Sequence, residues 1–192
     1  MNIKLFAFSF ILNILGLSAQ DHWVIDKDHS SIQFTVDHIV ISEVTGSFNS
    51  YSGSLSMKGD DFTTAKLVGE IEVKSIDTKN QQRDGSLKSP EFFDSDNYPK
   101  ITFVSKSISK SKSDKYVMRG DLTIKNVTKE IELEVNYKGT VKFMGQTKTG
   151  IKAYGVINRP DFNLNYNPLL ETGGAIIGKE VTIALNFEFA KQ

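Results

Sequence analysis

Apolar and polar residues alternate with a period of two through most of this chain. The clearest run is residues 130–137, where Ile131, Leu133, Val135 and Tyr137 alternate with three glutamates and an asparagine. Successive side chains of a β-strand point to opposite faces, so this pattern predicts a strand with one apolar and one wetted face. The glutamates then belong to the solvated face and not to a pair of catalytic carboxylates.

The same period recurs in further segments, separated by turn sequences such as Lys58-Gly59-Asp60-Asp61. With residues 130–137 they make about eight strands, at residues 32–36, 45–57, 67–74, 99–107, 115–124, 147–157 and 181–189. No long amphipathic helix is available to cover their apolar faces, so the faces must pack against one another. A sandwich or a closed barrel would do this. Long strands that follow one another directly favour an all-β fold, an eight-stranded antiparallel barrel.

Residues 83–103, RDGSLKSPEFFDSDNYPKITF, interrupt the alternation. Ser89-Pro90-Glu91 has the chemistry of a helix start, with a hydroxyl cap, a proline at the first helical position and an acid in the first turn. Phe92 and Phe93 follow at once, on a turn too short to bury them by itself. The sequence therefore predicts a short helical insert around residues 79–95, whose aromatic side chains close one end of the space between the strands.

This passage resembles the signature of the YceI-like family. Other family motifs follow in the expected order between Trp23 and about Phe189: WVID at 23–26, VTGSF at 44–48, GDLTI at 120–124 and RPDF at 159–162. The resemblance implies a lipocalin-like barrel that binds polyisoprenoid or similar amphiphilic lipids in the periplasm. Two positions depart from the usual pattern, with Ser86 in place of a histidine and Asn163 in place of a glycine.

The first 20 residues have the three-part layout of a secretory signal. Lys4 supplies the positive start, residues 5–17 form an apolar run, and Leu17-Ser18-Ala19 ends in small residues. The run is too short for a transmembrane span, which needs about 20 apolar residues. We expect residues 1–20 to be a signal peptide and residues 21–192 to be one exported domain. The resemblance implies the periplasm, with the extracellular space as the other destination.

Charge and cysteine content exclude several classes of function. Residues 21–192 carry 22 basic and 23 acidic side chains, which argues against nucleic acid as a partner. The chain has no cysteine, which excludes disulfides and thiol catalysis. A homodimer is compatible with the sequence, which gives no specific sign of one.

An eight-stranded barrel is either just filled by its own side chains or holds one small ligand. Glycines at 69, 120 and 155 share the parity of inward apolar residues, and either leave room inside or relieve curvature of the wall. We expect a ligand-lining set of inward apolar residues, with Phe92 and Phe93 closing one end: Phe34, Val36, Phe48, Ile71, Phe103, Leu122, Leu133, Val135, Ile183, Leu185 and Phe187.

Three polar residues are candidates for contact with a ligand's head group. His38 ends the first strand, where it either meets a head group or is bonded to a loop. Arg83, beside Asp84, either orients a phosphate or hydroxyl or forms a local ion pair that fixes the insert. Arg159, between a strand and Pro160, either contacts the ligand or binds loop carbonyls.

Metal or nucleophilic chemistry finds little support. The only histidines are His22, His29 and His38, and no motif supplies a nucleophile, a base and an orienting group. His22, Asp26, Asp28 and His29 could be imagined as metal ligands, but their order along the chain fits turn and strand-entry chemistry better. No cofactor, metal or catalytic residue is implied.

The sequence therefore favours a binding protein over an enzyme. We expect the barrel to hold one long apolar lipid, such as a polyisoprenoid, a prenylated quinone or a fatty-acid derivative. Two alternatives stay open: a structural or interaction barrel with a filled core and no ligand, and an envelope enzyme that acts on a lipid head group.

Overall fold

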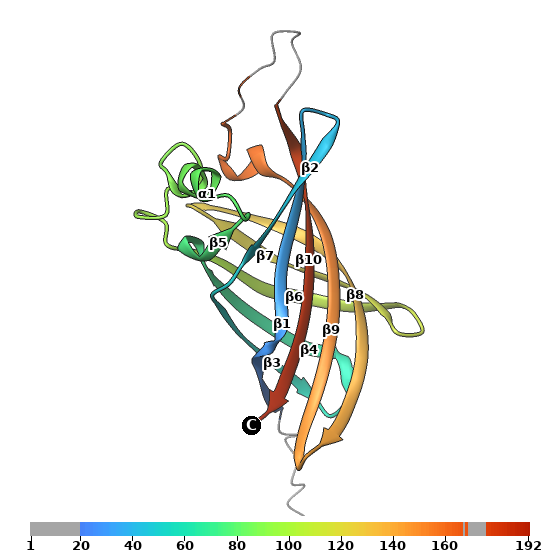
Figure 1. Cartoon of the computed structure of the whole chain (residues 1–192). Coiled ribbons are helices and arrows are strands. Elements are labelled where there is room, and N and C mark those ends of the chain that lie inside the picture. The colour runs from blue at the N-terminus through green and yellow to red at the C-terminus, as the bar shows by residue number, and fades with distance from the viewer. Residues whose placement is uncertain (1–19, 167, 169–175) are drawn as a thin grey trace, which may run out of the picture.

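The computed structural model describes residues 20–166, 168 and 176–192 (Figure 1), so the predicted signal peptide lies almost wholly outside the described residues. Ten strands, one α-helix and two short 3-10 helices make up the described part. They are β1 (Asp21–His38), β2 (Ser42–Phe48), β3 (Tyr51–Lys58), β4 (Asp61–Glu72), β5 (Ile76–Asp77), α1 (Gln81–Lys88), β6 (Lys100–Lys112), β7 (Lys115–Ile124), β8 (Val127–Phe143), β9 (Gln146–Asn158) and β10 (Ile177–Lys191), with η1 (Val73–Ser75) and η2 (Arg159–Phe162).

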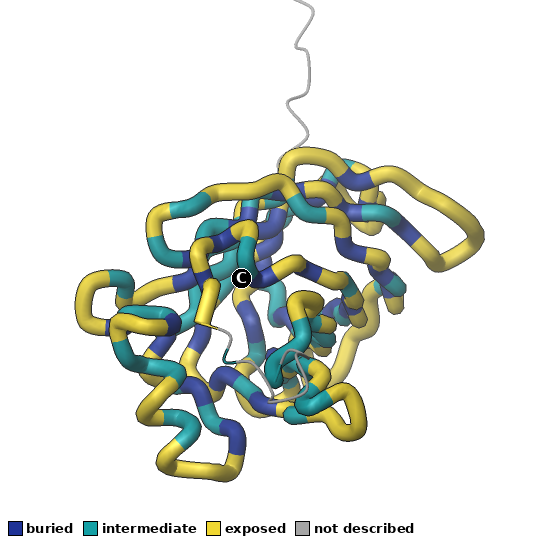
Figure 2. The backbone as a smooth tube through the Cα atoms, turned by 90° about the horizontal axis from the view of Figure 1, so that it is seen from above, coloured by how far each residue is buried: buried dark blue, intermediate teal, exposed yellow. Residues whose placement is uncertain are grey.

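Eight antiparallel strand positions close into a barrel. Neighbouring strands follow the order β10-β9-β8-β7-β6-β4-β3-β1, and pairing of β1 with β10, from Trp23↔Lys191 to His38↔Ile177, closes the ring. Buried and exposed residues alternate along the strands, as expected for a wall with one inner and one outer face (Figure 2). The predicted eight-stranded antiparallel barrel is confirmed.

The position between β4 and β1 is occupied by β3 at one end of β1 and by β2 at the other. Both pair with β1, β3 near its start (Val24↔Ser54) and β2 near its end (Ile32↔Phe48). Residues 45–57, predicted as one strand, are therefore interrupted at Asn49 and Ser50. The short β5 pairs with the end of β2, and the segment from η1 to β6, which contains α1, lies at the same end of the barrel as β2 (Figure 1).

The insert contains a helix, as predicted, but the helix begins earlier than expected. Asn80 is the N-cap, and its side chain accepts a hydrogen bond from the backbone N–H of Arg83 at 3.0 Å. Ser89 is the C-cap, with extended backbone dihedrals, and Pro90 begins the turn that follows. The prediction of a helix start at Ser89 is wrong: the residue before a proline avoids the α region, so α1 ends there, and only turns follow Pro90.

The end of the barrel opposite α1 is filled by its own side chains. Phe62 stacks on Tyr137 with ring centroids 4.6 Å apart and meets Tyr116 edge-on at 5.1 Å. Tyr137 donates a hydrogen bond to Asp60 in the β3–β4 turn. Further fully buried side chains belong to this end: Trp23, Leu55, Met57, Met118, Ile151 and Phe189. This packing seals the barrel at its base.

Candidate functional site

The other half of the barrel encloses a cavity of about 510 Å³. Its walls come from the end of β1, the ends of β4, β7 and β9, and the starts of β6, β8 and β10. Most of its lining is apolar, and the lining continues onto exposed Gln82 of α1 and half-exposed Tyr166. The cavity therefore reaches the surface beside the helical insert.

Most residues that the sequence predicted as lining do line this cavity. They are Phe34, Val36, Phe48, Ile71, Phe92, Phe93, Phe103, Leu122, Leu133, Ile183, Leu185 and Phe187. The prediction missed further residues of the same inward parity, among them Ile32, Ile101, Ile131 and Val181. Each lies two residues from a predicted one, so extending the alternation along its strand would have found it.

Val135 is placed wrongly by the sequence prediction. It faces inward and is buried, but it lies outside the cavity lining, paired with Tyr116 and Ala153 near the filled end. Alternation of period two tells which face of the wall a residue occupies. Alternation does not tell how far along the barrel axis a residue lies. Val135 lies closer to the filled end than Leu133, and this position along the axis excludes it from the cavity lining.

The three inward glycines have different environments. A Cβ on Gly69 would have only the Ser52 carbonyl oxygen near it, at 3.9 Å, and Gly69 lines the cavity. A Cβ on Gly120 would lie 2.5 Å from the Phe103 ring, and one on Gly155 would lie 2.5 Å from Leu133. Only Gly69 therefore leaves room in the cavity, because neighbouring side chains occupy the space beside the other two.

Aromatic side chains of the insert continue the cavity wall. The Phe93 ring meets Phe48 edge-on, with centroids 6.2 Å apart, and Phe48 contacts Phe34 at 5.7 Å. On the other side of the insert, Phe92 packs against Tyr166 at 5.0 Å. The insert thus lies against strands β1 and β2 on one side and against the segment after η2 on the other. This positions the insert over the end of the cavity.

Arg83 and Asp84 meet at Thr78 and not at each other within the described structure. Arg83 donates from Nε to the Thr78 hydroxyl and from Nη2 to the Thr78 carbonyl, both at 2.8 Å. Asp84 accepts from the Thr78 hydroxyl at 2.6 Å and from its backbone N–H at 2.9 Å. The expected local ion pair is therefore replaced by a shared anchor that fixes α1 to the chain before it, while Arg83 also lines the cavity.

Arg159 binds backbone carbonyls, which is one of the two roles that the sequence left open for it. Its guanidinium donates to the carbonyl oxygens of Gly178 (2.8 Å), Leu164 (2.5 Å), Tyr166 (2.9 Å) and Ile177 (3.2 Å). The residue is only 4% exposed, and this burial lowers the pKa of its guanidinium. It also lines the cavity, so its charge lies next to a mainly apolar space.

His38 lines the cavity near the β1–β2 turn. Its backbone carbonyl accepts hydrogen bonds from the Ser42 hydroxyl at 3.2 Å and from the Ile41 N–H at 3.3 Å. Its backbone is thus fixed by the turn. All three predicted head-group residues, His38, Arg83 and Arg159, border the same cavity.

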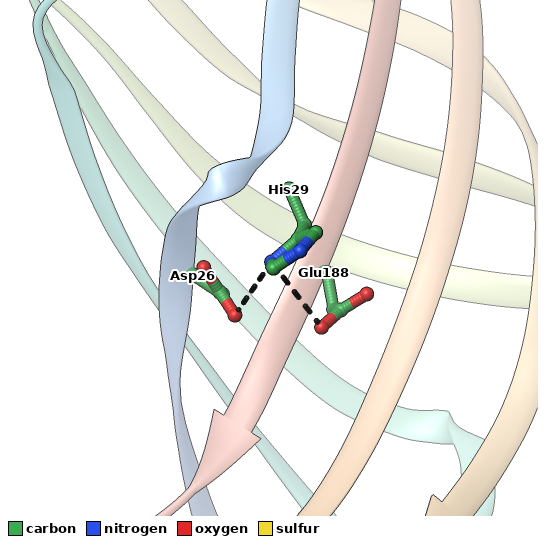
Figure 3. Close-up of side chains that lie close together, drawn as sticks. All are labelled: Asp26, His29 and Glu188. Carbon is green, nitrogen blue, oxygen red and sulfur yellow. Dashed lines mark hydrogen bonds and ion pairs between the residues drawn. The ribbon is translucent and has the colours of Figure 1, made fainter.

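A histidine and two acids come together elsewhere, on the outside of the barrel (Figure 3). His29 Nδ1 lies 3.1 Å from Asp26 Oδ2 and 3.9 Å from Glu188 Oε1. The Lys148 ammonium group lies between the same two carboxylates, at 2.9 Å from Asp26 and 2.7 Å from Glu188. Lys148 therefore already supplies the positive charge that a metal ion would bring, and the cluster is an ion-pair network.

The sequence identified only part of this cluster. It grouped Asp26 and His29 with His22 and Asp28, but Glu188 is distant in sequence and reaches Asp26 only through the register of β1 with β10. That register shifts between Asp26 and Ser31, at an irregularity that accommodates the turn-like residues of this segment.

These features define a class of protein: a single closed β-barrel, sealed at one end, with an apolar internal cavity that opens beneath a helical insert. No helix in the described part of the chain is long and apolar enough to cross a membrane. Residues 23–189 match the YceI-like domain. The chain therefore belongs to the YceI-like family, as the sequence motifs suggested.

Relatives and solved structures agree with this assignment. A UPF0312 protein of Staphylococcus aureus (strain MSSA476) is 40% identical over 171 residues, covering 88% of this chain and 97% of the relative. The crystal structure of the Campylobacter jejuni YceI protein is 30% identical, with a TM-score of 0.66 and coverage of 81% and 89%.

Two more distant structures share the fold. BcnA of Burkholderia cenocepacia is 21% identical, with a TM-score of 0.73 over 85% of this chain and 98% of that one. A polyisoprenoid binding domain from Saccharophagus degradans is 14% identical, with a TM-score of 0.66 over 88% and 98%.

Proposed function

We propose that this protein holds the apolar chain of one amphiphilic lipid inside the barrel, with the polar end of the lipid at the opening beside α1. The observation that carries the proposal is the apolar cavity of about 510 Å³ in a barrel whose opposite end is packed solid. Such a space favours an apolar chain that enters from one side only. The polyisoprenoid binding domain from Saccharophagus degradans, which shares this fold, supports the same chemistry.

The cavity volume limits the length of chain that fits. If each methylene-sized atom takes roughly the 30 Å³ of a water molecule in the liquid, the cavity holds at least about 17 such atoms. That corresponds to a fatty-acyl chain or three to four prenyl units. A longer polyisoprenoid or quinone tail would be held by part of its length, and the remainder would emerge at the opening.

Burial of apolar surface supplies the binding free energy. At about 25 cal/mol per Å², a chain that removes roughly 300 Å² of apolar surface from water gains about 7 to 8 kcal/mol before ordering costs. No chemical step is needed for this role, so the proposed activity is binding and not catalysis.

We also propose that binding takes place after export, in the periplasm or outside the cell. The support is the charge, apolar run and small residues of positions 1–20, which form a secretory signal pattern. In an aqueous compartment, a protein that carries or stores a lipid must shield the apolar chain from water, and a closed barrel does this.

The proposal is tested by titrating the delipidated protein with geranylgeraniol, a C20 prenyl alcohol, and with palmitate in a calorimeter. Gly69→Leu places a side chain in the one open inward glycine position and should weaken binding at least tenfold while the barrel folds. Val156→Leu, on an exposed position of β9 outside the lining, is the matched control and should bind like wild type. Absence of binding of either ligand by the folded wild-type protein would favour a barrel that acts through its surface.

A further inference from the structure

The turn between β1 and β2 exposes consecutive large apolar residues at the open end of the barrel. Val40 is 82% exposed and Ile41 is 86% exposed, and Ile39 precedes them. This three-residue turn, here called the β1–β2 tip, projects beyond the barrel at the same end as α1 (Figure 1). An exposed apolar run of this kind is unfavourable in water and indicates contact with another apolar phase.

The backbone of the tip is strained as well as exposed. Ile39 and Val40 have φ angles of +55° and +65°. Hairpin turns with two such residues strongly prefer Asn-Gly, because positive φ is costly for a β-branched side chain. Strained positions of this kind persist when the surrounding structure fixes them, and they cluster at functional sites.

The tip is fixed by residues that line the cavity. The Ile39 N–H donates to the Ile176 carbonyl at 2.8 Å, and the Ile41 N–H donates to the His38 carbonyl at 3.3 Å. Both Ile176 and His38 border the cavity. The exposed apolar tip and the cavity opening are therefore adjacent and joined by backbone hydrogen bonds.

We propose that the β1–β2 tip inserts into the apolar layer of a lipid bilayer and holds the cavity opening against the membrane from which the lipid is drawn. Insertion into a bilayer is inferred from the exposed apolar side chains of the tip. The role of docking in lipid uptake rests on the proposed lipid-binding function. Asp37 and Glu43 flank the tip. Attraction to anionic head groups is therefore not the driving force, and a neutral phosphatidylcholine surface should suffice.

A second exposed apolar turn provides an internal control. The β8–β9 turn exposes Val141, Phe143 and Met144, but it lies at the filled end of the barrel, away from the cavity (Figure 1). If any exposed apolar turn binds vesicles, the two turns will behave alike. If docking serves the cavity, only the β1–β2 tip will matter for lipid transfer.

The test measures vesicle binding and lipid transfer separately. Flotation of the ligand-free protein with phosphatidylcholine vesicles reports docking, and transfer of a fluorescent C20 prenyl lipid between such vesicles reports function. The double variant Ile39→Asn/Val40→Gly introduces the favoured turn sequence. It should raise the melting temperature, because the strain is relieved, and yet reduce vesicle binding and the transfer rate at least fivefold.

The double variant Val141→Ser/Phe143→Ser should leave the transfer rate unchanged. Wild-type vesicle binding by Ile39→Asn/Val40→Gly would overturn the proposal, as would a tip variant that changes only self-association in sedimentation. Flotation needs no ligand, so a protein that docks but binds no prenyl lipid would contradict the proposed function and leave the docking inference standing.

Discussion

The Phe103 ring occupies the space that a side chain at Gly120 would need. A Cβ at residue 120 would lie 2.5 Å from Phe103 Cζ and 2.6 Å from the Val104 carbonyl oxygen. Because the carbonyl belongs to the barrel wall, the clash cannot be relieved by moving one flexible side chain. Gly120 thus lets a large aromatic residue lie along the wall and line the cavity without filling it.

Gly120→Ala should therefore lower the free energy of unfolding by about 2 kcal/mol, in the usual range for overpacking. Urea unfolding followed by the fluorescence of Trp23, the only tryptophan and a buried one, measures this directly. Gly69→Ala is the matched control, since its Cβ would enter open space. A Gly120→Ala protein as stable as Gly69→Ala would contradict this packing.

Arg159 should be essential for the stability of the segments around the cavity opening. Arg159→Met removes the donors to four backbone carbonyls that the structure buries around the guanidinium, and we expect a loss of about 3 kcal/mol or more. Arg119→Met removes an exposed arginine paired with Glu132 and should change stability by no more than about 0.5 kcal/mol. Equal effects of the two substitutions in chemical denaturation would refute the assignment.

The Asp26–Lys148 pair predicts a pH dependence on the acid side. The Lys148 ammonium, hydrogen-bonded to the Asp26 carboxylate, together with His29, lowers the pKa of Asp26 from 3.8 to about 2. A lowered pKa in the folded state stabilises the protein above pH 3.8, and this contribution is lost as the pH falls toward 2.

Lys148→Met removes the main cause of that shift. The variant should be less stable than wild type at neutral pH and should lose less further stability between pH 4 and pH 2. Thermal unfolding at closely spaced pH values measures both slopes. Parallel slopes for the two proteins would show that the pair does not control the titration of Asp26.

Phe93 should control how firmly a ligand is held. Its ring packs on Phe48 at the cavity wall, so Phe93→Ala opens the space beneath the insert. We expect about tenfold weaker binding of geranylgeraniol, equivalent to about 1.4 kcal/mol, mainly through faster dissociation in stopped-flow displacement. Phe143→Ala, at the exposed β8–β9 turn, is the control; if both variants release ligand at the wild-type rate, Phe93 does not close the cavity.

Much of the fold could be predicted because period two carries the needed information. The alternation at residues 131–137 identifies β8 and its inner face, and the lack of amphipathic helices means that the apolar faces must pack against one another, in a sandwich or a barrel. The height of Val135 in the barrel could not be predicted, because it depends on the shear between strands. The helix start was misjudged because Ser89-Pro90 also satisfies the rules for a helix end.

Long-range pairing explains what the sequence missed in the polar clusters. Glu188 and Lys148 meet Asp26 only because β10 lies between β1 and β9 in the closed barrel. Thr78 anchors both Arg83 and Asp84. Its position in the sequence relative to them does not predict this contact. Local motifs identify residues with polar chemistry, and the tertiary register decides their partners.

The most direct test of the central claim is native mass spectrometry of the protein purified without detergent from the organism that makes it, followed by solvent extraction of any bound molecule. The account predicts one lipid per chain, with an apolar tail at least about as long as the 17 atoms that the cavity holds. A ligand-free mass, unchanged after incubation with prenyl alcohols and fatty acids, would contradict it.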